Sequence, residues 1–254
     1  MATLKLYGVP GSHPTDCVEA ALRLKGLPYK RRDYLPVMHK ALMRPAFGGV
    51  TVPGLKVDGQ RMLGSRAILR KLDELQPEPP LVPADAAARA RVEEAESWGD
   101  VVLQPLARRV SWAVLRRNSK AMLSYAGDSK LGLPTGMLAP GAPATAWAAS
   151  KLNHASDEQV QSDLRELPGH LDRIDAWVGE GVLGDAERAN VADLQIGSSL
   201  RLLMTLGDIR PLIEGRPCAA LSERWFWPSP GHAAAGALPA GWVPEAPPSA
   251  TPAA

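Results

Sequence analysis

The stretch TVPGLKVDGQRMLGSRAI, residues 51–68, carries the strongest structural signal in the chain. At its centre, Asp58-Gly59 joins two short strand-like runs, and this dipeptide is typical of a two-residue β-hairpin turn. Pro53 opens the first strand and has no amide hydrogen to donate. We therefore expect the Val52-Pro53 peptide bond to be cis and the Val52 backbone to be free to pair with a peptide-like ligand.

Ser65 lies where the hairpin ends and a helix over residues 66–75 begins. A hydroxyl at this position, together with the first amides of the helix, can hold a carboxylate group. Alternatively, Ser65 only caps the helix. With the Val52 backbone, this turn predicts a clamp for a peptide-like molecule.

The sequence around the hairpin alternates strand and helix signals. The predicted elements are a strand over 3–7, a helix over 15–25, a strand over 29–34, a helix over 37–42, the hairpin and the helix over 66–75. This β-α-β-α-β-β-α order predicts an α/β domain over residues 1–76. Its first two strands should be parallel and its last two antiparallel.

The remainder of the chain predicts a second domain. Residues 77–84 are rich in proline, which cannot continue a helix, and indicate a linker. Residues 85–227 have apolar positions at helical spacing and indicate an all-helical domain. Within it, 127–145 is rich in glycine and proline, and we regard this irregular excursion as a possible cover for a cleft. Residues 228–254, rich in proline and alanine, predict a loosely packed tail.

Two helices of the second domain have specific signals. Asn190 can cap a helix while the Asp193 carboxylate reaches back to the cap amide, which is a capping box. We expect Asp193 to act in stability alone. The first helix should kink at Pro105. Its predicted buried stripe comprises Val92, Ala95, Trp98, Val102, Leu106, Val110 and Val114.

The first domain resembles the thioredoxin-like domain of glutathione transferases. The resemblance covers residues 4–75 and rests on the order and spacing of several short motifs. These are Leu4-Lys5-Leu6-Tyr7-Gly8, Ser12-His13-Pro14, His39-Lys40, Val52-Pro53 and Ser65-Arg66-Ala67-Ile68. The resemblance implies the glutathione transferase fold, an α/β thioredoxin-like domain followed by an all-helical domain, and a homodimer.

The resemblance also implies a site for glutathione as co-substrate. His39 and Lys40 would meet its glycine carboxylate through a hydrogen bond and a point charge. Alternatively, both are solvated residues on a short helix. The residues implied to hold the rest of the tripeptide are Val52, Pro53, Ser65 and Arg66.

Such chemistry requires the thiol to ionise. A cysteine thiol has a pKa near ~8.5, and one well-placed hydroxyl bond to the thiolate supplies about 1.5–3 kcal/mol, enough to lower that pKa by roughly one to two. Ser12 matches the activating serine of the theta-like and phi-like classes, and the dipole of the helix that follows is favourable. Tyr7 is the competing donor. In a third interpretation Ser12 is only a loop or capping residue.

Two departures from the family pattern concern the identity of the thiol. Gly64 stands where the family usually has Glu, Asp or Gln to contact the γ-glutamyl amino group, and losing that bond should cost about 1.5–3 kcal/mol. The segment 44–53 is longer than its family counterpart and lacks a lysine. Either another carboxylate substitutes, for example from a partner subunit, or the protein uses a different low-molecular-weight thiol.

A pocket for a hydrophobic electrophile is expected between the loop at Val9-Pro10 and the kinked helix. Its predicted lining is Pro10, Trp98, Val102, Arg109 and Trp112, with core packing as the alternative. A cluster of arginines on the same helix either attracts an acidic substrate or forms a charged face in a dimer groove. These arginines are Arg108, Arg109, Arg116 and Arg117.

Composition excludes several other functions. The chain has 254 residues, of which 45% are hydrophobic, and its net charge of +2 is too small to indicate a nucleic-acid partner. No apolar run approaches the ~20 residues of a membrane span, and no leader is recognisable, so we expect a cytoplasmic protein without membrane contact. Cys17 and Cys218 form no CxxC pair, Cys17 should face the core, and no metal-ligand spacing is present.

The sequence thus predicts a glutathione transferase-like enzyme that conjugates a bound thiol to a small hydrophobic electrophile, as in detoxification. One alternative is a glutathione-dependent isomerase of the same fold, in which the thiol adds to a double bond and leaves again. The other is a non-catalytic ligand-binding protein with a degraded thiol site.

Overall fold

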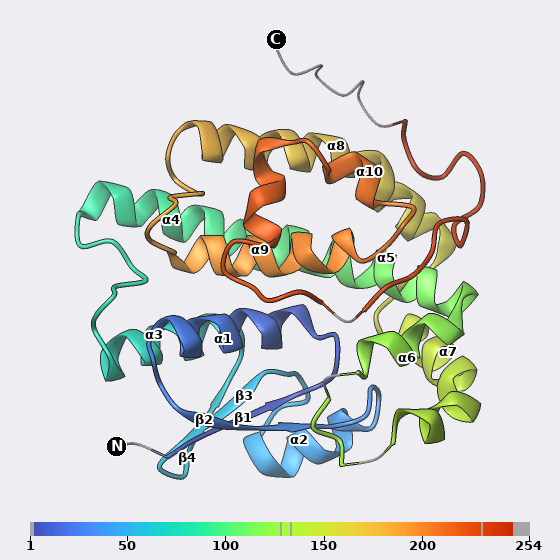
Figure 1. Cartoon of the computed structure of the whole chain (residues 1–254), viewed down its shortest axis with the longest axis horizontal. Helices are drawn as coiled ribbons and strands as arrows, with labels where there is room; N and C mark the ends of the chain where they lie inside the picture. The colour runs from blue at the N-terminus through green and yellow to red at the C-terminus, as the bar shows by residue number, and fades with distance from the viewer. Residues whose placement is uncertain (1–2, 128, 133, 230, 246–254) are drawn as a thin grey trace.

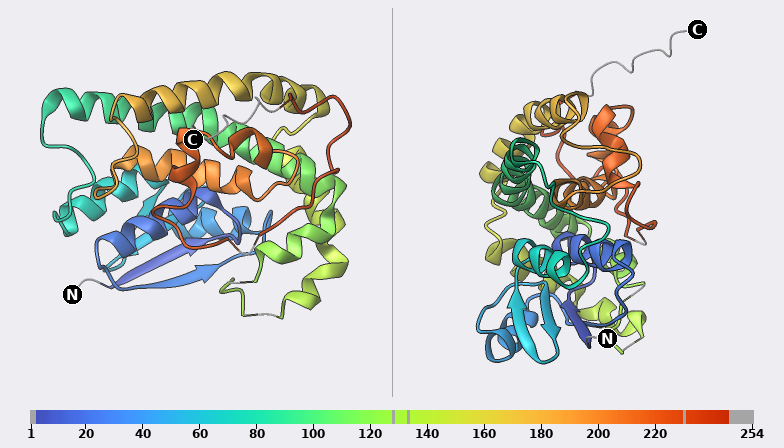
Figure 2. Two further views of the ribbon diagram at one scale, coloured as in Figure 1. Left: turned by 45° about the horizontal axis from the view of Figure 1, so that its top comes forward. Right: turned by 90° about the vertical axis from the view of Figure 1, so that its left-hand side faces the viewer.

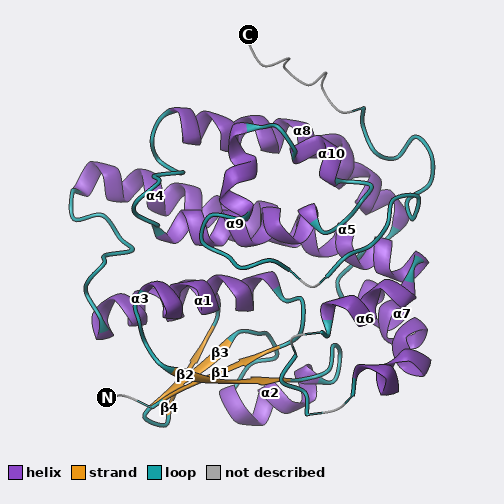
Figure 3. Cartoon of the chain, in the orientation of Figure 1, coloured by secondary structure: helices purple, strands orange, loops and turns teal. Residues whose placement is uncertain are grey.

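The computed structural model describes residues 3–127, 129–132, 134–229 and 231–245. A four-stranded sheet lies at one end of the molecule, and helices are stacked on it in layers (Figure 1). Figure 3 shows that the strands all belong to the N-terminal part, whereas the rest is helical. This arrangement confirms the predicted α/β domain followed by an all-helical domain.

The N-terminal domain has the predicted order of elements. They are β1 (Leu4–Gly8), α1 (His13–Leu24), β2 (Tyr29–Asp33), α2 (His39–Phe47), β3 (Gly54–Val57), β4 (Gln60–Leu63) and α3 (Ser65–Leu75). The sheet order is β2-β1-β3-β4, with β1 parallel to β2 and β3 antiparallel to both of its neighbours. Helices α1 and α3 cover one face of the sheet and α2 covers the other (Figure 1).

The hairpin forms as its turn residues require. Asp58 and Gly59 both adopt positive φ, 48° and 90°, the backbone of a two-residue hairpin turn, between the paired Val57 and Gln60. The Val52-Pro53 bond is cis, as expected. The helix predicted over 37–42 is displaced, because α2 begins later and continues through a proline to end at a left-handed glycine.

The helical domain surrounds one buried helix. Its helices are α4 (Ala86–Trp98), α5 (Gln104–Arg117), α6 (Met122–Tyr125), α7 (Ala142–Leu152), α8 (Asp157–Gly179), α9 (Val191–Met204) and α10 (Arg210–Ile213). Helix α9 is buried along nearly its whole length and contacts α1, α4 and α5. Figure 2 shows α9 between the N-terminal domain and the outer layer of helices. The interface between the domains is therefore part of the core.

Burial of the predicted apolar stripe is confirmed at its two ends, whereas Val102 in its middle is not buried. A π-helical turn, Gly99–Leu103, separates α4 from α5. Because a π-turn holds one residue more than an α-turn, it advances the register and buries Leu103 in place of Val102. Pro105 follows this turn in the first turn of α5, where proline is tolerated.

The predicted capping box at the start of α9 is confirmed. The Asn190 side chain accepts the Asp193 amide at 3.0 Å, and the Asp193 carboxylate accepts the amides of Asn190 and Gly184 at 2.9 and 2.8 Å. Burial raises the pKa of Asp193 to about 6, so the group is largely ionised at pH 7. Asp193 thus joins the preceding loop to α9.

Replacing Asp193 with alanine should lower the free energy of unfolding by about 2–4 kcal/mol, because two amides lose a charged acceptor in a buried setting. Urea unfolding followed by circular dichroism measures this loss. Asn190→Ser is the control, since serine caps about as well as asparagine. A loss for Asp193→Ala no larger than for the control would contradict the prediction.

The prediction of a loose tail is wrong for residues 231–245. Ala233 is buried and exchanges backbone hydrogen bonds with the end of α9, donating to Thr205 at 2.9 Å and accepting from Gly207 at 2.8 Å. The Asp208 carboxylate accepts three successive amides at 236–238. Such anchoring needs no apolar periodicity, so the composition did not reveal it. Residues 246–254 lie outside the described residues.

Candidate functional site

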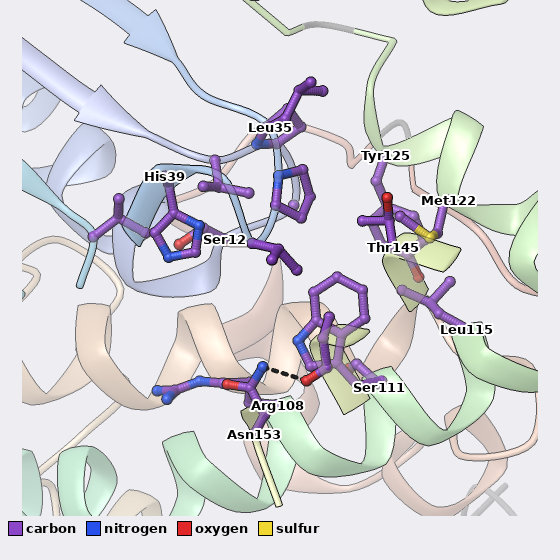
Figure 4. Close-up of a pocket in the computed structure, with 18 of the residues that line it drawn as sticks. Ser12, Leu35, His39, Arg108, Ser111, Leu115, Met122, Tyr125, Thr145 and Asn153 are labelled. Carbon is purple, nitrogen blue, oxygen red and sulfur yellow. Dashed lines mark hydrogen bonds between the residues drawn. The ribbon is translucent and has the colours of Figure 1, made fainter. Parts of the chain in front are cut away.

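A cavity of about 870 Å³ lies where the N-terminal domain meets α5, α6 and α7. One wall comes from the loop after β1, the segment 35–40 and the residues Val52, Pro53, Gly64 and Ser65. Figure 4 shows Ser12, His39 and Arg108 at one side of the cavity and Leu115, Met122 and Tyr125 at the other. The cavity is therefore polar at one end and apolar at the other.

Ser12 lines this cavity at the start of α1. Its side chain makes no hydrogen bond to the helix amides, so it does not act as a capping serine. The buried Thr15 hydroxyl donates to Ser12 Oγ at 3.0 Å. Because Ser12 Oγ accepts this bond, its own hydrogen is available for another acceptor.

Tyr7, the competing donor, does not reach the cavity. Side chains alternate along β1, so Leu6 faces α1 and α3 while Tyr7 faces α2. The Tyr7 ring packs edge-on against Phe47 at 5.1 Å and stacks with Tyr34 at 6.1 Å. The structure thus provides no support for Tyr7 as a hydroxyl donor in the site.

Ser65 was expected either to hold a carboxylate or to cap α3, and in the structure its hydroxyl does neither. Gly64 is the residue that precedes α3, and Ser65 is the first helical residue, so Ser65 is no cap. Its buried hydroxyl donates to Gln195 Oε1 at 3.0 Å and is engaged within the protein. Arg66 is not among the residues that line the cavity, and it forms an ion pair with Glu96 at 3.3 Å, which joins α3 to α4.

His39 and Lys40 both line the cavity and are only partly exposed. His39 Nδ1 is buried without a hydrogen-bond partner within the described residues. Burial, together with the charge of Lys40, lowers the pKa of His39. At neutral pH this end of the cavity carries a neutral imidazole and a cationic ammonium group.

The predicted electrophile pocket is correct in part. Pro10 and Trp112 line the cavity, but Trp98, Val102 and Arg109 do not. Trp98 packs against Trp177, with the ring centroids 5.3 Å apart, and the π-turn moves Val102 out of register. Arg109 forms a two-pronged pair with Asp163, so its charge is already neutralised.

Arg108 differs from its neighbours on α5. Arg116 and Arg117 both pair with Asp157, whereas Arg108 faces the cavity and forms no ion pair with any residue that the structure describes. Its guanidinium donates to the neutral Gln104 Oε1 at 2.6 Å. Burial lowers the pKa of Arg108. The cavity therefore contains a partly desolvated cation that has no carboxylate in ion-pair contact within the described residues, although the charge of Asp100 acts on it from farther away.

The excursion at 127–145 contributes to the cavity wall. Leu131, Met137 and Leu138 line it, and α7 continues that wall with Ala142 and its neighbours. The suggestion that this segment covers the cleft agrees with these positions. The apolar end of the cavity is thus formed by a part of the chain with little sequence periodicity.

Residues 6–80 match a family model described as glutathione S-transferase, N-terminal domain. This match covers the sheet, its three helices and the proline-bearing edge of the cavity. Residues 6–80 thus resemble the N-terminal domain of glutathione S-transferases. A maleylpyruvate isomerase of Ralstonia sp. is 37% identical over 95 residues, which are 35% of this chain and 43% of that enzyme. The chain thus aligns with less than half of this relative.

Solved structures of glutathione S-transferases and related proteins share the fold. A beta-etherase, LigF, from Sphingobium sp. strain SYK-6 has a TM-score of 0.57 at 19% identity, with 80% of this chain and 84% of that chain covered. A theta class glutathione S-transferase from Xanthomonas axonopodis pv. citri with glutathione bound has a TM-score of 0.52 at 18% identity, covering 79% and 82%. At these identities the likeness describes the architecture of both domains.

None of the helices in the described ranges is long and apolar enough to cross a membrane. Over the same ranges, no group of three or more His, Cys, Asp and Glu side chains is placed to hold a metal ion.

Sequence reasoning missed a chain of polar groups that crosses the site. Gln195 Nε2 and Gln104 Nε2 both donate to Asp100 Oδ1, at 3.3 and 2.7 Å, and Gln104 in turn accepts from Arg108. The spacing of Asp100, Gln104 and Arg108 at i, i+4 and i+8 is a signal that could have found them on one helical face. Gln195 had no local signal, because it lies on the buried α9.

Proposed function

We propose that this protein is a glutathione-dependent enzyme that attacks a small electrophile with the sulfur of a bound thiol. Ser12 donates its free hydrogen to the thiolate, and the Val52 backbone pairs with the peptide part of the thiol. His39 and Lys40 receive a carboxylate of the thiol. The apolar end of the cavity, with Pro10 and Trp112, receives the electrophile.

The proposal depends mainly on one observation, that the Ser12 hydroxyl accepts a hydrogen bond and has its own hydrogen available to donate. Thr15 occupies an acceptor position of Ser12 Oγ, which leaves the Ser12 hydrogen for an anion beside the start of α1. A hydroxyl bond to an anion is worth about 1.5–3 kcal/mol, and the helix dipole adds to it. Conjugation is the default reaction. The thiolate forms an S–C bond while the bond to the leaving group breaks and the leaving group departs with its electron pair; on addition to an activated double bond, the resulting carbanion instead takes up a proton.

A glutathione-dependent isomerase is the second candidate, because Arg108 offers an unpaired cation to a carboxylate-bearing substrate. The similarity to a protein named maleylpyruvate isomerase supports the same reading. In that reaction the thiolate adds to a double bond, rotation follows, and the same S–C bond breaks to return the thiol. Turnover without net loss of thiol distinguishes isomerisation from conjugation.

We propose further that the protein is a cytoplasmic homodimer that acts in detoxification. The support for all three properties is the similarity of residues 6–80 to glutathione S-transferases. Sedimentation of the purified protein tests the dimer.

Calorimetric titration with glutathione and S-hexylglutathione tests the proposed site. We expect micromolar to low-millimolar binding of both. Lys40→Gln should weaken binding about tenfold through loss of one charge-assisted bond, while Lys71→Gln, on the outer face of α3, should not. Absence of binding by the unmodified protein would contradict a glutathione-dependent function, and binding without any turnover would indicate a non-catalytic carrier.

A further inference from the structure

A row of four cationic side chains crosses the sheet on the face opposite α1 and α3. Lys5 on β1 is paired with Lys30 on β2 on one side and with Lys56 on β3 on the other. Lys56 is in turn paired with Arg61 on β4. Because side chains at paired positions lie on the same face of a sheet, each strand contributes one cation to this row. We call these four residues the basic row.

The basic row lies beside the part of the sheet that α2 covers. Tyr7, two residues after Lys5 and therefore on the same face, packs against Phe47 of α2. At the end of the sheet nearest the N-terminus, none of the described elements covers this face (Figure 1). Three members of the basic row are accordingly exposed, and Lys56 is half-buried.

The charge of the basic row is not neutralised by the protein. None of its members forms an ion pair with any residue that the structure describes. The nearby acidic side chains are engaged elsewhere, because Asp58 accepts the Thr3 amide at 2.7 Å and Asp33 pairs with Arg31 at 3.0 Å. Like charges at opposite positions on neighbouring strands repel and lower the stability of a sheet. An unneutralised row of this kind indicates an anionic partner.

The charge of the chain is also unevenly distributed along the sequence. Residues 1–64 contain ten Lys and Arg against four Asp and Glu, which gives a formal charge of +6. The whole chain carries +2, so the remainder carries −4. Such asymmetry is typical of proteins that bind an anionic surface, and the small net charge of the whole chain conceals it.

Exposed apolar side chains lie on α2 beside the basic row. Met43 and Phe47 face the sheet, since both lie within 3 Å of the position that a Cβ on Gly54 would take. At helical spacing, Met38 and Leu42 then lie on the side of α2 away from the sheet. They are 58% and 44% exposed. The outer side of α2 therefore presents apolar groups to solvent.

The basic row and α2 form one continuous surface. Lys56 Nζ lies 5.6 Å from the centroid of the Phe47 ring, and Arg61 donates to the Pro45 carbonyl at 3.3 Å. Two cations of the row thus contact the helix that carries the exposed apolar side chains. Basic groups and apolar groups are in this way presented together at one edge of the molecule.

This combination favours a lipid bilayer over a nucleic acid. Proteins that bind at the surface of a bilayer combine basic side chains, which meet anionic headgroups, with apolar ones that enter the headgroup region. Single-stranded nucleic acid on a sheet instead requires exposed aromatic rings on which bases stack. On this face, Tyr7 packs against Phe47 and Tyr34 and is not free for such stacking.

We propose that the basic row and the outer side of α2 attach the protein to the surface of an anionic lipid bilayer. This inference does not depend on the proposed thiol chemistry. It departs from the expectation of no membrane contact, which rested on the absence of an apolar span, because surface attachment needs no span. Met38 also lines the cavity, so the attached surface adjoins the candidate site.

Cosedimentation with vesicles tests the inference. The unmodified protein should bind vesicles of phosphatidylserine and phosphatidylcholine in equal parts, and not vesicles of phosphatidylcholine alone. Binding should weaken as salt is added. Each cation near an anionic bilayer strengthens binding about fivefold, so Lys5→Gln with Lys30→Gln should weaken it about 25-fold. The control, Arg165→Gln with Arg210→Gln, removes the same charge from α8 and α10, far from the sheet (Figure 1), and should stay within about twofold.

A second pair of variants tests the apolar contact. Leu42→Ser should weaken binding to the anionic vesicles about three- to tenfold, because an apolar side chain is no longer buried in the headgroup region. Val101→Ser, at an exposed position on the π-helical turn, should leave binding within about twofold. Thermal unfolding of the Lys5 and Lys30 double variant should show no loss of stability, since repulsion within the sheet is relieved.

Three results would overturn the inference. The first is absence of binding to the anionic vesicles at low salt, or equal binding to both kinds of vesicle. The second is an equal loss in the control variants. The third is tighter binding of single-stranded polyuridylate than of the anionic vesicles, which would assign the basic row to a nucleic acid. Thiol-dependent turnover in solution should be unchanged in these variants, so none of these results bears on the proposed function.

Discussion

Replacing Ser12 with alanine should lower kcat/KM for thiol-dependent turnover about 10- to 100-fold. This is the loss expected when one hydrogen bond from a hydroxyl to a thiolate is removed. Binding of glutathione should change by less than about threefold, because the bond strengthens only when the sulfur is ionised. The pKa of the bound thiol, followed by the ultraviolet absorbance of the thiolate, should rise toward its free value of ~8.5.

Tyr7→Phe is the matched control for this experiment. The Tyr7 ring lies on the α2 side of the sheet, so loss of its hydroxyl should leave the rate within about twofold and the thiol pKa unchanged. Thr15→Val should lower the rate moderately and Thr15→Ser should restore it, since Thr15 only orients Ser12. A rate that depends on Tyr7 and not on Ser12 would overturn the assignment of the donor.

Replacing Arg108 with glutamine should reduce kcat/KM for electrophiles that carry a carboxylate by about 30- to 5000-fold, and for neutral electrophiles by less than about threefold. The guanidinium is partly desolvated and has no carboxylate partner among the described residues, so an anionic substrate would supply one. Truncating one partner of such a buried charge pair costs about 2–5 kcal/mol. Steady-state rates with matched acid and ester substrates measure the difference.

The control for Arg108 is Arg116→Gln on the same helix. Arg116 shares Asp157 with Arg117, which leaves that carboxylate paired after the substitution. Its rates should match those of the unmodified protein with both substrates. An equal fall for acid and ester substrates in Arg108→Gln, at an unchanged melting temperature, would show that Arg108 shapes the cavity and does not select charge.

The order of elements in the first domain could be predicted because its signals are local. Asp58-Gly59 determines its own hairpin through the backbone conformations that these residues tolerate. The capping box at Asn190 is equally local, since all of its bonds join residues close in sequence. The cis bond before Pro53 is local in the same way. Ser12 was selected through the resemblance to glutathione transferases, and it lines the cavity.

The wrong site predictions arose where a feature of the backbone, such as strand alternation or a π-turn, determines the side of the element on which a side chain lies. Tyr7 and Ser12 stand five positions apart, but the alternation of β1 turns Tyr7 to the opposite face of the sheet. One additional residue in the π-turn moves Val102 out of register, and Trp98, which precedes the turn, packs against Trp177. Periodicity analysis assumes a regular helix, so it could not place these residues correctly.

The sequence by itself determined the order of strands and helices, the hairpin at Asp58-Gly59 and the capping box at Asn190, because each depends on contacts within a few residues. The tertiary structure alone decided which arginine remains unpaired and where a carboxylate meets the start of α3. Arg109 and Arg108 are adjacent in the chain, yet only Arg109 meets a carboxylate from α8. Likewise, Asp100 reaches Ser65 only through Gln195 on α9, and such charge pairing depends on distances in space between groups far apart in sequence.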